Sequence, residues 1–196
     1  ITGKGDISKF NKEHASYAVI CRNNSSVLQK LIAAANSGEY VHCNINLQEL
    51  FAKVYHISSL LFNKEPKYPV AELKQYKNRK ELLQASEKDQ ELKTLINITS
   101  TLSEGEGLFT NINNIKKYAT EDQKIAKYSV TTAHKSKGLE WEYVILCDDL
   151  APRILENQTF FDWVNDNPQE VNLLYVAATR AKYQIIPGEV LSEYLY

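Results

Sequence analysis

The sequence predicts an α/β protein in which a parallel sheet is flanked by helices and interrupted by a helical insertion. Three observations predict it. Residues 17–43 read as strand, helix and strand joined by short loops, a unit whose two strands normally run parallel. Residues 46–127 carry helical apolar stripes. Strand patterns then return between 128 and 186. Strands at both ends of the chain, with helices between them, indicate one sheet domain with an insertion.

The first unit contains two short apolar runs, YAVIC at 17–21 and EYVHC at 39–43. Between them, apolar residues recur at three- and four-residue steps, which predicts a helix that Ser25 or Ser26 can cap and Gly38 ends. A unit of this kind implies a right-handed crossover between two parallel strands of one sheet.

The later strands are predicted at 128–132, 143–147 and 183–186. Asn167 followed by Pro168 predicts a helix start between the last two, since proline suits the first helical position. Trp141 could stack on a nucleic-acid base or pack beneath the preceding loop, and we expect packing because it precedes a buried strand.

Composition limits the function classes. The chain has 196 residues, 43% of them hydrophobic, and a net charge of −1, so a polyanion site has to be local. Its three cysteines lie far apart in or beside apolar runs, which indicates reduced, buried thiols of a cytoplasmic protein. The spacing shows no zinc pattern, so we expect no metal ligands, and no apolar run is long enough for a membrane span.

Charge gathers in one segment between two strands, VTTAHKSKGLEWEYVIL at 130–146. A solvated turn explains this composition by itself. A polyanion site is the alternative, because the carboxyl edge of an open α/β sheet is where ligands bind. Arg22, at the end of the first strand, and Arg180, at the end of a helix, are each explained singly by an exposed arginine. We expect all three signals to meet at one sheet edge, which favours the anion site.

Three stretches also resemble motifs of the superfamily-one helicases of the UvrD/Rep type. TTAHKSKGLEWEYVIL resembles motif V, NLLYVAATRAK resembles motif VI and AVICRNNS resembles motif IV. The Leu-Glu-Trp ending and the Asn-Leu-Leu-Tyr start are most similar to the F-box DNA helicase branch and its bacterial relatives. This resemblance implies the second of two RecA-like lobes, formed by residues 1–45 and 128–196, with 46–127 as a short inserted subdomain.

The resemblance also implies roles. Arg22 and Arg180 would reach the γ-phosphate of ATP as arginine fingers, while Gly138 and Glu140 would line the nucleotide. Thr132 and His134 would contact the backbone of single-stranded DNA. The partners implied are single-stranded DNA and an N-terminal RecA-like lobe of the same protein. The cofactor implied is ATP with Mg²⁺, and the Mg²⁺ would be held mainly by that N-terminal lobe. A nuclear location follows for a eukaryote, or a nucleoid one for a bacterium.

No phosphate-binding loop of the form G-x-x-x-x-G-K-[ST] occurs in the 196 residues. We therefore expect the chain alone neither to bind ATP tightly nor to hydrolyse it. The complete protein is expected to be an ATP-dependent 3′-to-5′ DNA helicase. The alternatives are a catalytically inactive nucleic-acid-binding module and the helicase half of a recombination nuclease. The helicase interpretation requires Arg22 and Arg180 to converge on one face.

Overall fold

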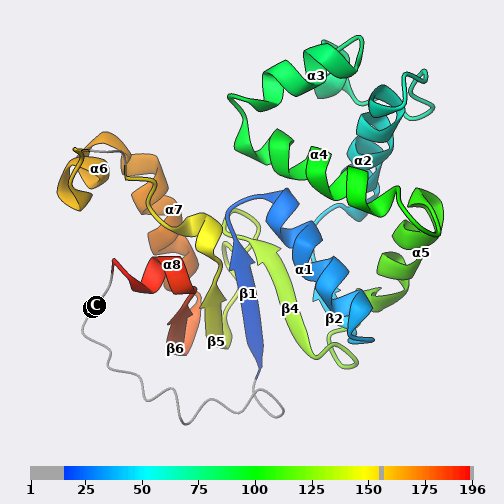
Figure 1. The fold of residues 1–196 in the computed structure, drawn as a ribbon. Helices are drawn as coiled ribbons and strands as arrows, with labels where there is room; N and C mark the ends of the chain where they lie inside the picture. The colour runs from blue at the N-terminus through cyan, green and yellow to red at the C-terminus, as the bar shows by residue number, and fades with distance from the viewer. Residues whose placement is uncertain (1–15, 155–156, 195–196) are drawn as a thin grey trace.

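A six-stranded parallel sheet forms the centre of the computed structural model, which describes residues 16–154 and 157–194 (Figure 1). Every pairing in the described chain is parallel, and the strand order is β3-β2-β4-β1-β5-β6. The predicted α/β fold with a parallel sheet is thus confirmed. The strands are β1 (Tyr17–Cys21), β2 (Val41–Cys43), β3 (Ala119–Thr120), β4 (Tyr128–Thr132), β5 (Trp141–Leu146) and β6 (Ala181–Pro187).

Helices follow the apolar periodicity of the sequence. They are α1 (Asn24–Asn36), α2 (Leu47–Leu61), α3 (Arg79–Ser86), α4 (Gln90–Leu102), α5 (Leu108–Tyr118), α6 (Phe160–Asp166), α7 (Pro168–Ala178) and α8 (Glu189–Ser192). The N-cap of α1 is Asn23, whose side chain accepts the N–H of Ser26, so the prediction of a serine cap was wrong by two or three residues. An asparagine oxygen at this position satisfies a helix N–H that has no partner within the helix.

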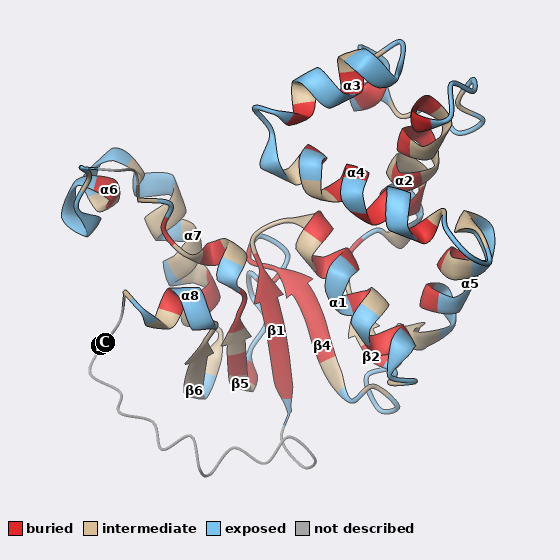
Figure 2. Cartoon of the chain, viewed as in Figure 1, coloured by how far each residue is buried: buried red, intermediate tan, exposed pale blue. Residues whose placement is uncertain are grey.

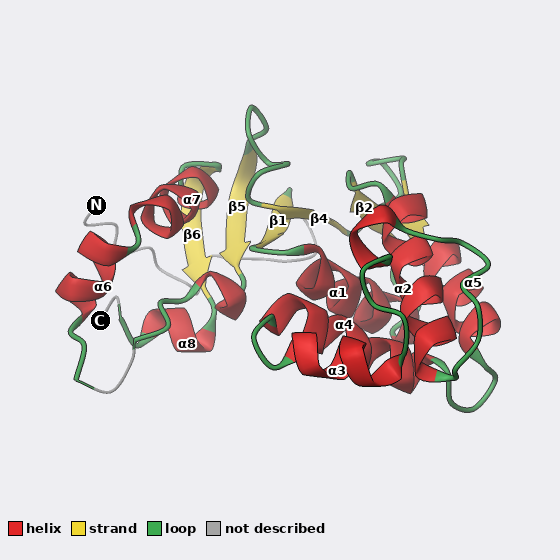
Figure 3. Cartoon of the chain, turned by 90° about the horizontal axis from the view of Figure 1, so that it is seen from above, coloured by secondary structure: helices red, strands yellow, loops and turns green. Residues whose placement is uncertain are grey.

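The two faces of the sheet are covered by different helices. Along β1, Tyr17, Val19 and Cys21 belong to the hydrophobic cluster that includes α1, whereas Ala18 and Ile20 belong to the cluster that includes Ala177 of α7. This alternation follows from the two-residue period of a strand. Figure 3 shows α1 and α7 on opposite sides of the sheet, and Figure 2 shows the central strands buried between them.

The helices α2 to α5 share the core of the α1 face. Phe51, Leu82 and Ile112 are at most 2% exposed and join the same cluster as Leu28 of α1. Strand β3 lies inside the range expected for the insertion, but it pairs with β2 and so extends the sheet. None of the helices in the described residues combines the length and hydropathy needed to cross a membrane.

Candidate functional site

One loop links the two edges of the sheet. Strands β4 and β5 both lie parallel to β1, on either side of it, so the connecting residues 133–140 must return from the carboxyl edge to the amino edge. Ser136 anchors this loop: it is fully buried, its N–H donates to the carbonyl of Thr132 at 2.9 Å, and its Oγ donates to the carbonyl of Ala133 at 2.7 Å. The two ends of the charged segment therefore lie at opposite edges.

The carboxyl edge brings together Arg22, Thr132 and His134. They line a cleft of about 500 Å³, here called the carboxyl-edge cleft, together with Asn23, Lys135 and Glu170. His134 and Lys135 are exposed, whereas Thr132 is buried and its Oγ1 accepts the N–H of Lys135 at 3.4 Å. Thr132 thus shapes the turn that carries the two exposed basic side chains.

Arg22 is already paired within this cleft. Its Nε and Nη2 donate to the two carboxylate oxygens of Glu170, at 2.7 and 2.5 Å. The hydrogen bond to Arg22 lowers the pKa of Glu170, and the hydrogen bond to Glu170 raises the pKa of Arg22. A bidentate carboxylate neutralises the guanidinium, so Arg22 offers little free charge to a second anion.

The amino edge brings together Gly138, Glu140 and Arg180. The N–H of Trp141 donates to the carbonyl of Arg180 at 3.0 Å, and Nη1 of Arg180 approaches the carbonyl of Leu139 at 3.4 Å. These contacts hold the start of β6 beside the end of the loop. Gly138 has a φ of +85°, a conformation that favours glycine over residues with a side chain.

Protein oxygens position the guanidinium of Arg180. Its Nε donates to the carbonyl of Val176 at 3.0 Å, and its Nη2 donates to Oγ1 of Thr179 at 3.0 Å. Within residues 16–154 and 157–194, no ion pair joins Arg180 to a carboxylate. Arg180 is therefore an oriented cation that keeps its charge available, unlike Arg22.

The structure places Arg22 and Arg180 at opposite edges of the sheet, so the expectation that they share one edge is wrong. Arg22 binds Glu170 in the first turn of α7, whereas Arg180 follows the last turn of the same helix. Glu170 and Arg180 are ten positions apart, most of them in α7, which at the rise of a helix corresponds to roughly 15 Å. The helix α7 runs back from the carboxyl edge towards the start of β6, so its two ends necessarily lie at opposite edges of the sheet.

A comparison with models of protein families identifies the family of this chain. The model of the UvrD-like helicase C-terminal domain matches residues 23–186, which is most of the chain. This chain belongs to the UvrD-like helicase family. The match covers every predicted site residue except Arg22, which lies directly before it, and it does not depend on where the two arginines lie.

A curated relative agrees with this assignment. The UvrD-like lobe is 29% identical over 114 residues to F-box DNA helicase protein 1 of Schizosaccharomyces pombe. The matched segment covers 56% of this chain and 13% of that relative. The lobe therefore spans a small part of the relative's length.

Two charged residues of the UvrD-like lobe were missed by the sequence analysis as site residues. Glu170 pairs with Arg22 from 148 positions away, so no local pattern in the sequence marks it. Lys182 lies two residues after Arg180, and its Nζ is 3.6 Å from a carboxylate oxygen of Glu140. Both members of this second pair are exposed, so the carboxylate of Glu140 stays accessible.

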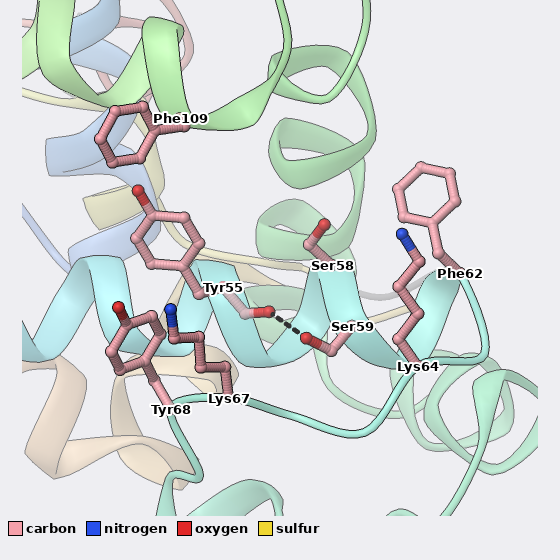
Figure 4. Close-up of a pocket in the computed structure, with 8 residues that line it drawn as sticks. All are labelled: Tyr55, Ser58, Ser59, Phe62, Lys64, Lys67, Tyr68 and Phe109. Atoms are coloured by element: carbon pink, nitrogen blue, oxygen red, sulfur yellow. Dashed lines mark hydrogen bonds between the residues drawn. The ribbon is translucent and has the colours of Figure 1, made fainter.

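A further cavity, of about 320 Å³, lies on the inserted helices (Figure 4). It contains none of the predicted site residues. Its wall includes Tyr55, Phe62, Lys64, Lys67, Tyr68 and Phe109. The hydroxyl of Ser59 donates to the carbonyl of Tyr55 there, at 3.0 Å, which is a bond within α2.

Proposed function

We propose that this chain is the second motor lobe of an ATP-dependent DNA helicase, which moves 3′ to 5′ along single-stranded DNA together with a first lobe of the same protein. The family match supports a helicase lobe. The observation that carries the ATP-dependent step is the oriented guanidinium of Arg180, which has oxygen ligands from its own chain and no carboxylate partner among the described residues.

The chemistry of the amino edge fits a nucleoside triphosphate. Arg180 provides the positive charge that a terminal phosphoryl group needs as it departs, which is the role of an arginine finger. Glu140 provides carboxylate oxygens that accept hydrogen bonds from ribose hydroxyls. Gly138 allows the backbone to approach a ligand without a Cβ in the way.

The remaining contacts with ATP would come from another part of the protein. These 196 residues contain no phosphate-binding loop and no hydroxyl placed by such a loop to hold Mg²⁺. In the proposed enzyme, ATP and Mg²⁺ are held mainly by the first lobe, and this lobe contributes Arg180, Glu140 and Gly138 from across the interface. The Mg²⁺ would supply the charge that neutralises the phosphates.

The carboxyl edge would hold the DNA strand. His134 and Lys135 are exposed there, and Thr132 holds the turn that presents them. Contacts from such residues to phosphates position a strand without reading its sequence. Arg22 is assigned to the DNA side in this proposal, because it lines the carboxyl-edge cleft with Thr132 and His134.

The loop 133–140 would couple the two sites. Its first residues lie at the carboxyl edge of the sheet and its last residues at the amino edge, with buried Ser136 between them. A change in the contacts of Glu140 is therefore transmitted to His134 through a short, anchored segment. In this proposal the loop carries so much charge because each end of it faces a different polyanion.

The test is Arg180→Ala in the full-length protein, with ATP turnover and single-strand binding measured separately. We expect turnover to fall by about a thousandfold or more, with DNA affinity retained. Arg79→Ala, an exposed arginine of α3, is the matched control and should leave turnover unchanged.

Loss of DNA binding with intact turnover in the Arg180→Ala variant would contradict the assigned role. A wild-type protein that binds DNA but never turns over ATP would instead favour the inactive binding module.

A further inference from the structure

Two buried thiols meet at the carboxyl ends of neighbouring strands. Cys21 is the last residue of β1, and Cys147 directly follows β5. Ile20 lies opposite Leu146 in the register of these strands, so the next position places the two cysteines side by side. Their Sγ atoms are 3.0 Å apart, and neither residue is more than 7% exposed. They are separated by 126 positions, so no spacing pattern in the sequence reveals the pair.

A carboxylate completes the cluster. One ligand atom each from Cys21, Cys147 and Asp149 lies within 4.8 Å of the others. Oδ2 of Asp149 accepts the backbone N–H groups of Arg22 and Asn23, at 2.9 and 3.2 Å. Oδ1 is buried and has no hydrogen-bond donor within the part of the chain that the structure describes. A buried carboxylate oxygen is costly to leave unpartnered, so this atom indicates a cationic ligand.

The donor atoms select the kind of cation. Two sulfurs and one carboxylate oxygen suit a borderline-soft divalent ion such as Zn²⁺, whereas Mg²⁺ and Ca²⁺ prefer oxygen ligands only. Tetrahedral Zn²⁺ with Zn–S bonds of about 2.3 Å requires two sulfurs roughly 3.8 Å apart. The thiols would therefore have to separate by less than about 1 Å, which a small side-chain rotation provides.

The cluster lies beside an open cleft. Asp149 lines an open cleft of about 580 Å³ together with Arg22, Asn23 and Glu170. An ion can approach its carboxylate from that side, and solvent can supply a fourth ligand.

We propose that Cys21, Cys147 and Asp149 form a binding site for a thiophilic divalent cation such as Zn²⁺. The bound ion would join the ends of β1 and β5 to the turn at Asp148–Leu150, directly beneath the backbone of Arg22 and Asn23. This site is structural and does not depend on the helicase activity.

The test is a titration of the reduced, chelator-treated 196-residue chain with Co²⁺, which reports thiolate ligands by a charge-transfer band in the near ultraviolet. We expect the band to saturate at one equivalent and to disappear when Zn²⁺ is added. Cys21→Ser and Cys147→Ser should each weaken Co²⁺ binding by more than about 100-fold, since even indirect partners of a metal cost up to that much. Cys43→Ser, at the third buried thiol, is the matched control and should retain the band.

The Asp149→Asn variant distinguishes a loss of ion binding from a loss of folding. The amide oxygen can still accept the N–H groups of Arg22 and Asn23, while the negative charge is lost. We expect about tenfold weaker Co²⁺ binding or more, with a melting temperature in chelator close to that of the wild type. If the serine variants fail to fold, this variant and the rise in wild-type melting temperature on adding Zn²⁺ decide the question.

Three results would overturn the proposal. They are a wild-type chain without a cobalt–thiolate band, a band that survives Cys147→Ser, and a Zn²⁺ affinity unchanged by Asp149→Asn. Formation of a Cys21–Cys147 disulfide in air, with no metal bound by the reduced chain, would assign the pair to thiol oxidation instead.

Discussion

The pair of Arg22 and Glu170 gives a prediction whose size follows from its exposure. It joins the end of β1 to the first turn of α7 through two hydrogen bonds of 2.7 and 2.5 Å. The side chains are 40% and 33% exposed, so solvent screens the pair. Removing one partner of a fully buried pair would cost about 3–5 kcal/mol, whereas exposed pairs contribute about 0.2–1 kcal/mol.

The interaction free energy between Arg22 and Glu170 should therefore be close to the upper end of the range for exposed ion pairs. In a double-mutant cycle with Arg22→Met and Glu170→Gln, we expect an interaction free energy of about 0.5–1 kcal/mol. The corresponding fall in melting temperature is a few degrees at most for a chain of this size, about 2–4 °C per kcal/mol. Urea unfolding at constant m-value measures both single variants and the double variant.

The matched control is the pair of Lys127 and Glu39, whose side chains are similarly exposed at 44% and 32%. An ammonium group lacks the planar fork of a guanidinium, so the same cycle on this pair should give a smaller coupling. A coupling near zero for Arg22 and Glu170 would refute the docking of α7 on β1 by this contact. A coupling above about 3 kcal/mol would refute the argument from exposure.

The same pair predicts a pH dependence. The hydrogen bond to Arg22 lowers the pKa of Glu170 below its ordinary value, more than burial raises it. The carboxyl therefore binds its proton less readily in the folded chain than in the unfolded one. Its contribution is complete above an unfolded pKa of about 4.3 and is lost as the pH falls through the folded pKa. Glu170→Gln should make the free energy of unfolding depend less on pH in this acidic range.

Freeing Arg22 should also change DNA binding. Glu170→Gln removes the carboxylate that neutralises the guanidinium, so a phosphate can take its place. We expect tighter binding of single-stranded DNA and a salt dependence steeper by up to about 0.7 in the logarithmic slope. An unchanged slope would place the strand away from Arg22.

Three further predictions concern single residues. His134→Ala should weaken single-strand binding modestly and make the logarithmic salt slope shallower by up to about 0.7, measured by fluorescence titration over a salt series. Gly138→Ala should cost about 1–2 kcal/mol in urea unfolding, because φ is +85° and no neighbouring atom obstructs a Cβ, which leaves backbone strain as the cause. Burial, and to a smaller extent the charge of Lys74, lowers the pKa of His56, whose Nδ1 accepts the N–H of Val70 at 2.9 Å. The unfolded chain therefore binds a proton at His56 more readily, so the free energy of unfolding should fall as the pH drops below about 6.5. His56→Gln should remove that dependence.

The sequence predicted the fold class because its signals are local. Alternating and helical periodicities depend on neighbours within a few residues, so the five predicted strands were found within two residues of their observed bounds. The short elements β3, α6 and α8 were not predicted. Trp141 is an example: it was expected to pack beneath the loop, and it is 8% exposed in the cluster of the α7 face. Such burial follows from the apolar strand that comes next.

The site was predicted only in part because its geometry depends on topology. The motif residues were recognised one stretch at a time, and all of them were expected at one edge. A loop that crosses from β4 to β5 and a helix that runs back to β6 divide them between two edges instead. The order of elements already held part of this answer, because Arg22 follows a predicted strand whereas Arg180 precedes one, and in a parallel sheet these are opposite edges. The pairing of Arg22 with Glu170 is not contained in the sequence spacing.

What the sequence determined by itself is the set of elements, the family resemblance and the chemical nature of each candidate side chain. Only the tertiary structure decided which of these side chains meet. It paired Arg22 with Glu170, left Arg180 without a carboxylate among the described residues, and placed Cys21 beside Cys147. The physical reason is that contacts across 126 to 148 positions follow from strand order and register, which the packing of the whole core selects.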